Sequence, residues 1–233
     1  MRCARILALT AAAAALSPPP VRDRAVVLGG GFAGLYAALN LADSGVSTTL
    51  VDARDRFAFL PLLYEYAAGL ADESEVSAPF EDLCAGSRDL TFLRGDVDRI
   101  DFDAREATLA DGRTIRGDAL VIALGRRAPA APVGARPFYR LDDAAALRAT
   151  LEDWDAADSK RTAVVVGGGY TGVELACHLA RRRPGDDVSL LASGADVVPR
   201  AAAANRDAAR RALAAAGVDV RCDVAAEVDP NGV

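Results

Sequence analysis

Two glycine-rich turns of the form Gly-x-Gly-x-x-Gly are the stretches of this sequence best suited to chemistry. One spans residues 29–34 and the other spans residues 167–172, and each directly follows a short apolar run. In such a turn the first glycine permits a tight bend, the second lets backbone amides approach a pyrophosphate, and the third lets a helix pack closely on the strand. Free N–H groups and the dipole at the helix N-terminus then favour the anion. The sequence therefore predicts two dinucleotide sites, formed by Gly29, Gly31, Phe32, Ala33 and Gly34 and by Gly167, Gly169, Tyr170, Thr171 and Gly172.

The residues around the first turn complete a strand–helix–strand unit. The apolar run 25–28 is typical of a buried parallel strand, and apolar residues recur at helical spacing from Leu35 to Ala42. A β-branched run at 48–51 then ends at Asp52. A carboxylate at the end of the second strand is placed to accept hydrogen bonds from an adenosine ribose. We therefore interpret this unit as a nucleotide site, in preference to a glycine turn that serves packing alone.

The second unit lacks this carboxylate. Its second strand, expected over 188–191, is followed by Ala192 and Ser193 where the first unit has Asp52. A carboxylate about 4 Å from a 2′-phosphate would cost roughly 4 kcal/mol at an effective dielectric of 20. NADH without the carboxylate loses a charge-assisted hydrogen bond worth about 1.5–3 kcal/mol. The sequence thus favours NADPH, or use of both nucleotides, with Arg200 as a candidate phosphate partner and a solvated loop arginine as the simpler interpretation.

The order of elements predicts an α/β protein with two Rossmann-like domains. Between the glycine units we expect an apolar loop turning into a short helix over 57–69, strand-like segments over 90–116 and a buried strand at 119–123. Asp142 is expected to cap a helix that runs to Asp153. The repeat of the strand–glycine–helix pattern within one chain is more specific than either copy alone. The expected divisions are a leader at 1–21, a first nucleotide domain at 22–126, an interdomain linker and helix at 127–160, and a second nucleotide domain at 161–233.

The composition limits the class of partner and of compartment. The chain of 233 residues has a formal net charge of −6 and no basic run, which disfavours nucleic acid as a partner. Residues 1–21 place Arg2 and Arg5 ahead of an apolar run at 6–16, followed by Ser17 and three prolines. This pattern is typical of a targeting leader and is too short to span a bilayer. It does not separate secretory, mitochondrial and plastid leaders, and a disordered alanine-rich tail is the alternative.

The four cysteines and the single histidine do not have the spacing of a metal site or a disulfide framework. The cysteines are scattered, with no Cys-x-x-Cys motif, so no metal site is indicated. Cys177 and His178 fall in the expected helix of the second glycine unit. We interpret them as a packed small side chain and as a surface or capped histidine.

With these motifs the sequence resembles the two-dinucleotide-binding flavoproteins, and among them the type II NAD(P)H:quinone oxidoreductases. The resemblance rests on VVLGGGFAGLYAALNL, FLPLLYEYAAG, LVIALG and VVVGGGYTGVELA, and extends from Arg24 to the C-terminus. It is greatest for the plant and cyanobacterial branch thought to reduce demethylphylloquinone and related plastid quinones. The resemblance implies that Gly29, Gly31, Gly34 and Asp52 hold FAD and that the second glycine turn holds NAD(P)H.

The resemblance also implies roles for five further residues. Val97 would place its backbone against the adenine, and Gly125 would close the adenine side. Pro61 and Leu62 would lie near the isoalloxazine. Glu174 matches a glutamate near the nicotinamide and the flavin, where it would orient or electrostatically tune hydride transfer. An acid in the first turn of a helix, favoured by the helix dipole, is the alternative for Glu174.

The reaction implied by the resemblance is hydride transfer from NAD(P)H to FAD, then delivery of two electrons to a quinone. Disulfide reductases of this architecture carry a cysteine pair soon after the first unit, where this chain has only Cys84. That difference disfavours a disulfide substrate. A reductase of a ferredoxin- or rubredoxin-type protein and a non-catalytic nucleotide-binding fragment are the alternatives.

The family's pattern continues beyond residue 233 with a segment that binds FAD and with a C-terminal membrane-docking region. The resemblance therefore implies that the second FAD/NAD(P)-type domain is truncated here, and that peripheral membrane association depends on the missing region. Together with the leader-like N-terminus, it implies a transit peptide and plastid localisation, with the mitochondrion or a secretory route as alternatives.

Overall fold

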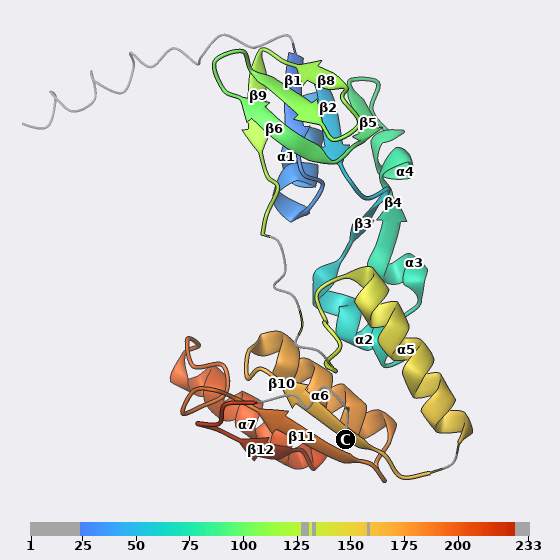
Figure 1. The fold of residues 1–233 in the computed structure, drawn as a ribbon, viewed down its shortest axis with the longest axis vertical. Helices are drawn as coiled ribbons and strands as arrows, with labels where there is room; N and C mark the ends of the chain where they lie inside the picture. The colour runs from blue at the N-terminus through green and yellow to red at the C-terminus, as the bar shows by residue number, and fades with distance from the viewer. Residues whose placement is uncertain (1–23, 127–130, 132–133, 158, 227–233) are drawn as a thin grey trace, which may run out of the picture. The chain divides into compact units, whose positions relative to one another are not determined.

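The computed structural model describes residues 24–126, 131, 134–157 and 159–226 (Figure 1). The chain forms two compact units: the first is assigned Met1–Arg56 and Pro79–Gly125, and the second Phe57–Ala78 and Arg126–Val233. The segment Phe57–Ala78 therefore packs within the second unit, although it lies before the expected boundary at residue 126. The expected leader lies outside the described residues, as does part of the expected linker.

A four-stranded parallel sheet forms the centre of the first unit. Its strand order is β5-β2-β1-β9. The central strand β1 is apolar on both faces because it is covered on both sides, and Val27 pairs in register with Leu50 and with Val121. The bounds are β1 (Arg24–Leu28), β2 (Ser47–Asp52), β5 (Leu90–Arg94) and β9 (Ala119–Ile122).

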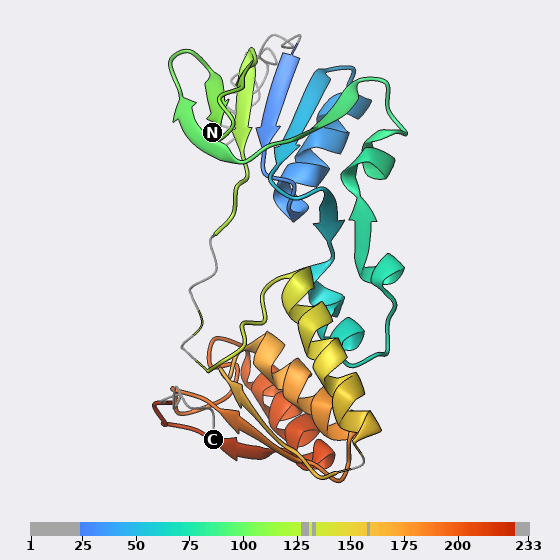
Figure 2. The ribbon, with the colours of Figure 1, turned by 45° about the vertical axis from the view of Figure 1, so that its right-hand side comes forward.

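A helix and a small antiparallel sheet cover this parallel sheet. Helix α1 (Phe32–Asp43) buries Leu35, Ala38 and Ala42, which recur at helical spacing. Val26 and Leu28 of β1 instead belong to a core shared with Ala107 and Leu109 of the antiparallel sheet. Figure 2 shows α1 in blue and the small sheet in green on either side of the strands. The small sheet has the order β6-β7-β8, with β6 (Val97–Asp101), β7 (Glu106–Leu109) and β8 (Thr114–Arg116).

The second unit contains a parallel sheet of three strands in the order β10-β11-β12. Helices α6 (Tyr170–Arg182) and α7 (Ala203–Ala216) supply its core, in which Leu190 and Leu213 are completely buried. The strands are β10 (Thr162–Val166), β11 (Asp187–Leu191) and β12 (Asp219–Arg221). This repeats the strand–helix–strand pattern of the first unit, as the sequence predicts.

The apolar segment after β2 packs on a long helix within the second unit. Helix α2 (Leu63–Ala67) and helix α5 (Leu141–Ala156) share a core that includes Ala144. Arg148 of α5 crosses this contact, because its Nη1 donates to Ala71 O at 3.0 Å and its guanidinium lies 5.1 Å from the centre of the Tyr66 ring. The second unit also contains a 3₁₀ helix η2 (Leu60–Leu62) and α3 (Glu73–Val76), and the first unit contains α4 (Phe80–Cys84). The short strands β3 (Arg56–Ala58) and β4 (Ser77–Pro79) pair as a two-stranded sheet of their own.

The prediction that Asp142 caps α5 is wrong. The helix begins at Leu141, so Asp142 lies in its first turn. The capping carboxylate is instead Asp143, whose Oδ2 accepts the backbone N–H groups of Tyr139 at 2.8 Å and Arg140 at 2.9 Å. An aspartate at this third position reaches back to the N-terminus as in a capping box, a geometry that the sequence pattern alone did not select.

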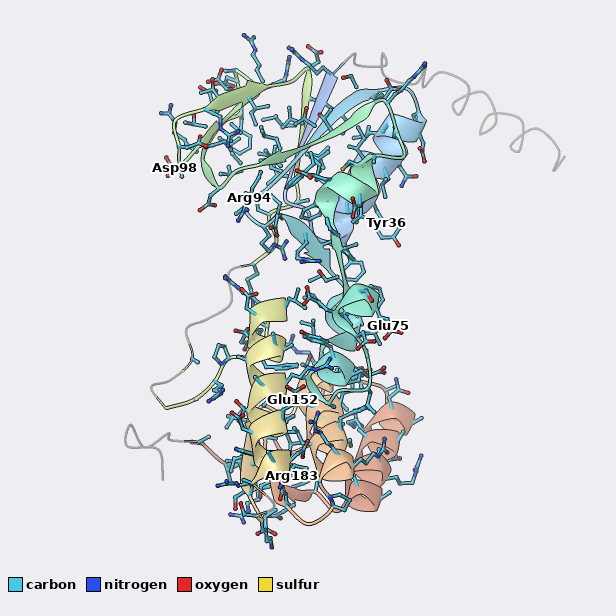
Figure 3. All side chains as sticks on the ribbon, turned by 90° about the vertical axis from the view of Figure 1, so that its right-hand side faces the viewer. Tyr36, Glu75, Arg94, Asp98, Glu152 and Arg183 are labelled. Carbon is cyan, nitrogen blue, oxygen red and sulfur yellow. The ribbon has the colours of Figure 1, made fainter. Side chains whose placement is uncertain are left out.

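Ion pairs fix the end of α6 against the end of α5. Arg183, labelled in Figure 3, donates from Nη1 to Asp155 Oδ1 and from Nε to Asp186 Oδ2, each at 2.6 Å. Arg182 donates to the other oxygen of Asp155, also at 2.6 Å. These contacts tie the long helix α5 to the nucleotide-type subdomain of the second unit.

In the part of the chain that the structure describes, no helix is both long and apolar enough to cross a membrane.

Candidate functional site

The first glycine turn joins β1 to α1 and leaves open space in front of the helix. Gly29 has φ +103° and donates its N–H to Val51 O at 2.7 Å, a conformation that favours glycine. A Cβ on Gly34 would collide with Gly29 O, so the third glycine is required for packing. A Cβ on Gly31, by contrast, would meet no atom within 4 Å. Gly31 is therefore not needed for packing, and its open side is a cradle that fits a pyrophosphate at the N-terminus of α1.

Asp52 lies directly behind this turn and is only 8% exposed. Its Oδ2 accepts the Gly30 N–H at 2.6 Å, which ties the end of β2 to the turn. Burial alone would raise the pKa of Asp52, but hydrogen bonds from Arg54 and from the Gly30 N–H outweigh that effect and hold the pKa below its usual value. The carboxylate is therefore ionised at neutral pH, at the place predicted for the ribose acceptor.

Arg54 is a member of this site that the sequence analysis missed. Its backbone N–H and its Nε both donate to Asp52 Oδ1 at 2.9 Å, and its Nη2 donates to Oδ2 at 2.9 Å. With the Gly30 N–H, these bonds use about four lone-pair positions, which is all that a carboxylate offers. A ribose hydroxyl that donates to Asp52 must therefore displace an Arg54 N–H. The Asp-x-Arg spacing at the end of β2 was the available signal.

The second glycine turn repeats this geometry. Gly167 has φ +121° and donates its N–H to Leu191 O at 2.8 Å. A Cβ on Gly172 would collide with Gly167 O, whereas a Cβ on Gly169 would meet nothing within 4 Å. The open space at Gly169, at the N-terminus of α6, fits a second pyrophosphate. Phe32 and Ala33, and likewise Tyr170 and Thr171, lie in the first turns of α1 and α6.

Ala192 is the structural counterpart of Asp52. Each follows the residue whose carbonyl accepts the N–H of the first glycine, namely Leu191 in the second unit and Val51 in the first. Ala192 is 1% exposed, and a Cβ on Gly168 would lie 2.6 Å from the Ala192 Cβ. A methyl group thus stands where the first unit has a buried carboxylate.

A cavity of about 320 Å³ opens beside Ala192. It lies between the second glycine turn and the loop after β11. Its lining includes Gly168, Gly169, Tyr170, Ala192, Ser193, Gly194, Asp196, Val198, Pro199 and Arg200. Two of the predicted residues of the second turn, Gly169 and Tyr170, thus line one cavity with the candidate phosphate partner Arg200.

Glu174 lies among titratable residues of α2 and α6. Burial raises its pKa, and Glu65 raises it further, while His178 opposes the shift. Helix α6 begins at Tyr170 and has no acid in its first turn, so Glu174 lies beyond that turn. The alternative interpretation, an acid in the first turn of its helix, therefore does not fit the position of Glu174.

His178 is half-buried beside Glu174. Its Nδ1 lies 2.8 Å from Glu174 O, and its ring centre lies 4.9 Å from that of Tyr64 on α2. This contact lies inside α6, one turn before His178, so it is not a helix cap. The neighbouring Cys177 is a buried thiol whose pKa is raised by burial, as expected of a packed side chain.

The residues placed by resemblance lie in different parts of the chain. Val97 begins β6 and packs against the core of the first unit, and Gly125 follows β9 with φ +70°. Pro61 is exposed and Leu62 is half-buried, both in the 3₁₀ helix of the second unit. Pro61 and Leu62 thus belong to the same unit as the second glycine turn and Glu174. Val97 and Gly125 belong to the same unit as the first glycine turn.

A second cavity, of about 270 Å³, lies in the first unit and was not predicted. It is lined by Asp55, Arg56, Pro79, Glu81, Phe92 and Arg94. Arg94, labelled in Figure 3, donates from Nε to Ala53 O at 3.2 Å and pairs with Asp55 at 3.7 Å. Because its acids and bases balance, this cavity presents no excess charge to a ligand.

The fold and the two glycine turns define an α/β protein built from two Rossmann-type units. The chain belongs to the pyridine nucleotide-disulphide oxidoreductase family, whose sequence model matches residues 23–233. It is 35% identical over 214 residues to demethylphylloquinone reductase NdbB of Synechocystis, covering 84% of this chain and 53% of that protein. It is 32% identical over 225 residues to the alternative NAD(P)H-ubiquinone oxidoreductase C1, chloroplastic/mitochondrial, of Arabidopsis thaliana. That match covers 84% of this chain and 43% of the Arabidopsis protein.

A solved structure shows the same fold. The covalent putidaredoxin reductase–putidaredoxin complex matches with a TM-score of 0.73 and 30% identity, over 86% of this chain and 50% of that chain. The chain thus spans about half the length of the relatives that it matches.

Proposed function

We propose that this chain binds FAD and NAD(P)H and supplies the dinucleotide-binding part of an NAD(P)H:quinone oxidoreductase. One observation carries the proposal: two glycine turns in one chain each leave open space at the second glycine, and only one of them is backed by a carboxylate. Binding of two different nucleotides explains why only one site has a carboxylate better than binding of the same nucleotide at both sites. The names of the Synechocystis and Arabidopsis relatives support quinone as the electron acceptor.

In this proposal the first unit holds FAD. The N–H groups at the start of α1 bind its pyrophosphate, and Asp52 accepts the adenosine ribose hydroxyls after Arg54 has moved. Val97 and Gly125 flank the adenine. FAD supplies the chemistry of hydride acceptance and electron delivery, while the chain supplies binding and alignment.

The second unit holds NAD(P)H through the open side of Gly169 and the N-terminus of α6. Glu174, one turn into α6, is the charged residue proposed to stand near the nicotinamide. In this proposal its carboxyl group orients or electrostatically tunes hydride transfer, and burial together with Glu65 raises its pKa.

The cysteines support a quinone over a disulfide as the acceptor. Among the described residues, Cys84, Cys177 and Cys222 are free thiols, and Cys84 and Cys177 are buried. Burial raises the pKa of the Cys84 thiol, which lowers its reactivity as a nucleophile. No described cysteine pair is therefore available to exchange with a disulfide substrate.

Plastid localisation and peripheral membrane contact belong to the same proposal. The leader-like residues 1–21 and the chloroplastic/mitochondrial name of the Arabidopsis relative support the former. Import of a fusion of residues 1–21 to a reporter into isolated chloroplasts tests it, and import into mitochondria alone contradicts it.

An acceptor comparison tests the proposed reaction. The purified chain, incubated with FAD, is assayed for NADPH oxidation with a short-chain quinone, with a ferredoxin and with a small disulfide. We expect turnover with the quinone alone. Turnover with ferredoxin but not with quinone identifies a reductase of a protein acceptor instead. The likeness to putidaredoxin reductase is the reason for including this acceptor. Nucleotide binding with no turnover on any acceptor identifies a binding fragment.

A further inference from the structure

The cavity beside Ala192 has the charge and the shape to distinguish two nicotinamide nucleotides. NADPH differs from NADH by a 2′-phosphate on the adenosine ribose, which is the group that the end of the second strand meets in a Rossmann unit. In the first unit this place holds the buried carboxylate of Asp52, and in the second it holds the methyl group of Ala192. The main source of repulsion toward a 2′-phosphate is therefore missing.

The one carboxylate that lines the cavity is already neutralised. Asp196 Oδ1 accepts the Val197 N–H at 2.8 Å and Arg210 Nε at 2.9 Å. Asp196 Oδ2 pairs with Arg210 Nη2 at 2.6 Å and with Arg206 Nε at 3.6 Å. Its acceptor positions point to α7 and to its own loop, so it offers little to a ribose hydroxyl and little repulsion to a phosphate. The sequence alone does not show this, because both arginines come from the following helix.

Arg200 is the cavity's remaining cation. It is exposed, and no hydrogen bond or ion pair joins its guanidinium to any other residue that the structure describes. The backbone that carries it is fixed: Val198 donates its N–H to Gly168 O at 2.6 Å, and Ala201 donates to Val198 O at 2.9 Å. The loop is thus tied to the glycine turn while its arginine is left without a partner.

We infer that this cavity selects a nucleotide with a 2′-phosphate, with Arg200 and the exposed hydroxyl of Ser193 as the groups that receive the phosphate. The inference rests on the proposed function, because it names which nucleotide the second unit takes. Arginine binds a phosphate through paired N–H groups, and such charge-assisted bonds are about twice as strong as neutral ones. Arg206 and Arg210 already pair with Asp196, so the charge of Arg200, the one arginine in the cavity lining, is available to a dianionic phosphate.

Calorimetric titration of the purified chain with NADPH and with NADH tests the inference. We expect NADPH to bind at least about 10-fold more tightly, the gain of one charge-assisted contact. The same ratio is expected between 2′,5′-ADP and 5′-AMP, which lack the nicotinamide. The Arg200→Gln variant should lose about 10-fold in NADPH affinity with NADH affinity within twofold of the parent chain. Arg211→Gln, which removes the same charge from an exposed position outside the cavity lining, should change neither.

The reverse change is Ala192→Asp, which copies the first unit. We expect it to weaken NADPH by about 100-fold or more through repulsion of the 2′-phosphate and to leave NADH equal or tighter. Equal binding of NADPH and NADH by the parent chain overturns the inference and leaves the proposed function intact. A parallel loss of both nucleotides in Arg200→Gln overturns the role of Arg200. Binding of neither nucleotide by the parent chain contradicts the proposed function itself.

Discussion

The carboxyl ends of β2 and β11 make the same backbone contact and carry different side chains. Val51 O and Leu191 O each accept the N–H of the first glycine of their turn, at 2.7 and 2.8 Å. The next residue is Asp52 in one unit and Ala192 in the other. The backbone therefore builds the same cradle twice, and the side chain after it decides which group of a nucleotide can lie there. The backbone around the two positions is similar, so the main difference between the two sites is the side chain of Asp52 or Ala192.

The second glycine of each turn offers the sharpest way to separate the two sites. Gly31 and Gly169 have ordinary φ values of −72° and −77°, and a Cβ on either meets no protein atom within 4 Å. We expect Gly31→Val to fold normally and to abolish FAD binding, because its side chain fills the pyrophosphate space. Gly169→Val should abolish NAD(P)H binding and spare FAD. Affinity losses above about 100-fold, measured by calorimetry, are expected for each variant on its own nucleotide.

Loss of both nucleotides from either single variant would contradict independent sites. A circular dichroism spectrum and a melting temperature close to those of the parent chain serve as the folding control for both variants.

Asp52 is the next largest test, because it has a structural and a binding role. Asp52→Asn removes the charge from the bonds to Arg54 and Gly30, and we expect a loss of about 1.5 kcal/mol in the free energy of unfolding at pH 7. FAD affinity should fall by about 10-fold. Because the pKa of Asp52 is lowered in the folded state, its stabilisation is present above about pH 4 and is lost as the pH falls further.

Denaturant titrations at pH 7 and pH 3 measure that effect. The difference between the parent chain and Asp52→Asn should be smaller at pH 3 than at pH 7, and an unchanged difference at pH 3 contradicts the assignment.

Arg54 sharpens the comparison in the opposite direction. Arg54→Gln frees Asp52 to accept ribose hydroxyls, so we expect FAD to bind several-fold more tightly. The free energy of unfolding should fall by about 1 kcal/mol, since the arginine side chain is half exposed and water screens the pair. Arg88→Gln is the matched control, because Arg88 is 93% exposed and makes only a surface contact with Asp89. Weaker FAD binding in Arg54→Gln means that the arginine contacts the bound nucleotide instead of competing with it.

Glu174 is expected to give the smallest change in stability. Its pKa is raised, so its ionisation opposes folding, and stability is lost as the pH rises through its folded-state pKa. Glu174→Gln should therefore raise the free energy of unfolding at pH 7 by a few tenths of a kcal/mol. The rate of flavin reduction by NADPH should fall in the same variant while NADPH affinity is kept. A destabilised variant with an unchanged reduction rate identifies Glu174 as a packing residue.

The glycine turns and their strands were predictable because their residue types follow from local geometry. Gly29 needs a positive φ and Gly34 needs the absence of a Cβ, and both requirements follow from the motif. The places that sequence reasoning missed depend on contacts between distant residues. Arg210 neutralises Asp196 from 14 residues away, and the cap of α5 is Asp143 because the helix begins at Leu141, two residues before the start that a cap at Asp142 implies. The packing of Phe57–Ala78 within the second unit is likewise decided by α5, which follows it by more than sixty residues.

The central claim is that one chain holds two different dinucleotides. Its most direct test is an anaerobic absorbance spectrum of residues 22–233 after incubation with FAD and desalting, recorded before and after NADPH is added. We predict retained flavin bands that bleach on addition of NADPH, with Gly169→Val retaining the flavin but failing to bleach. A protein that retains flavin and is bleached equally well in the Gly169→Val variant would contradict the assignment of the second turn, and a colourless protein would contradict that of the first.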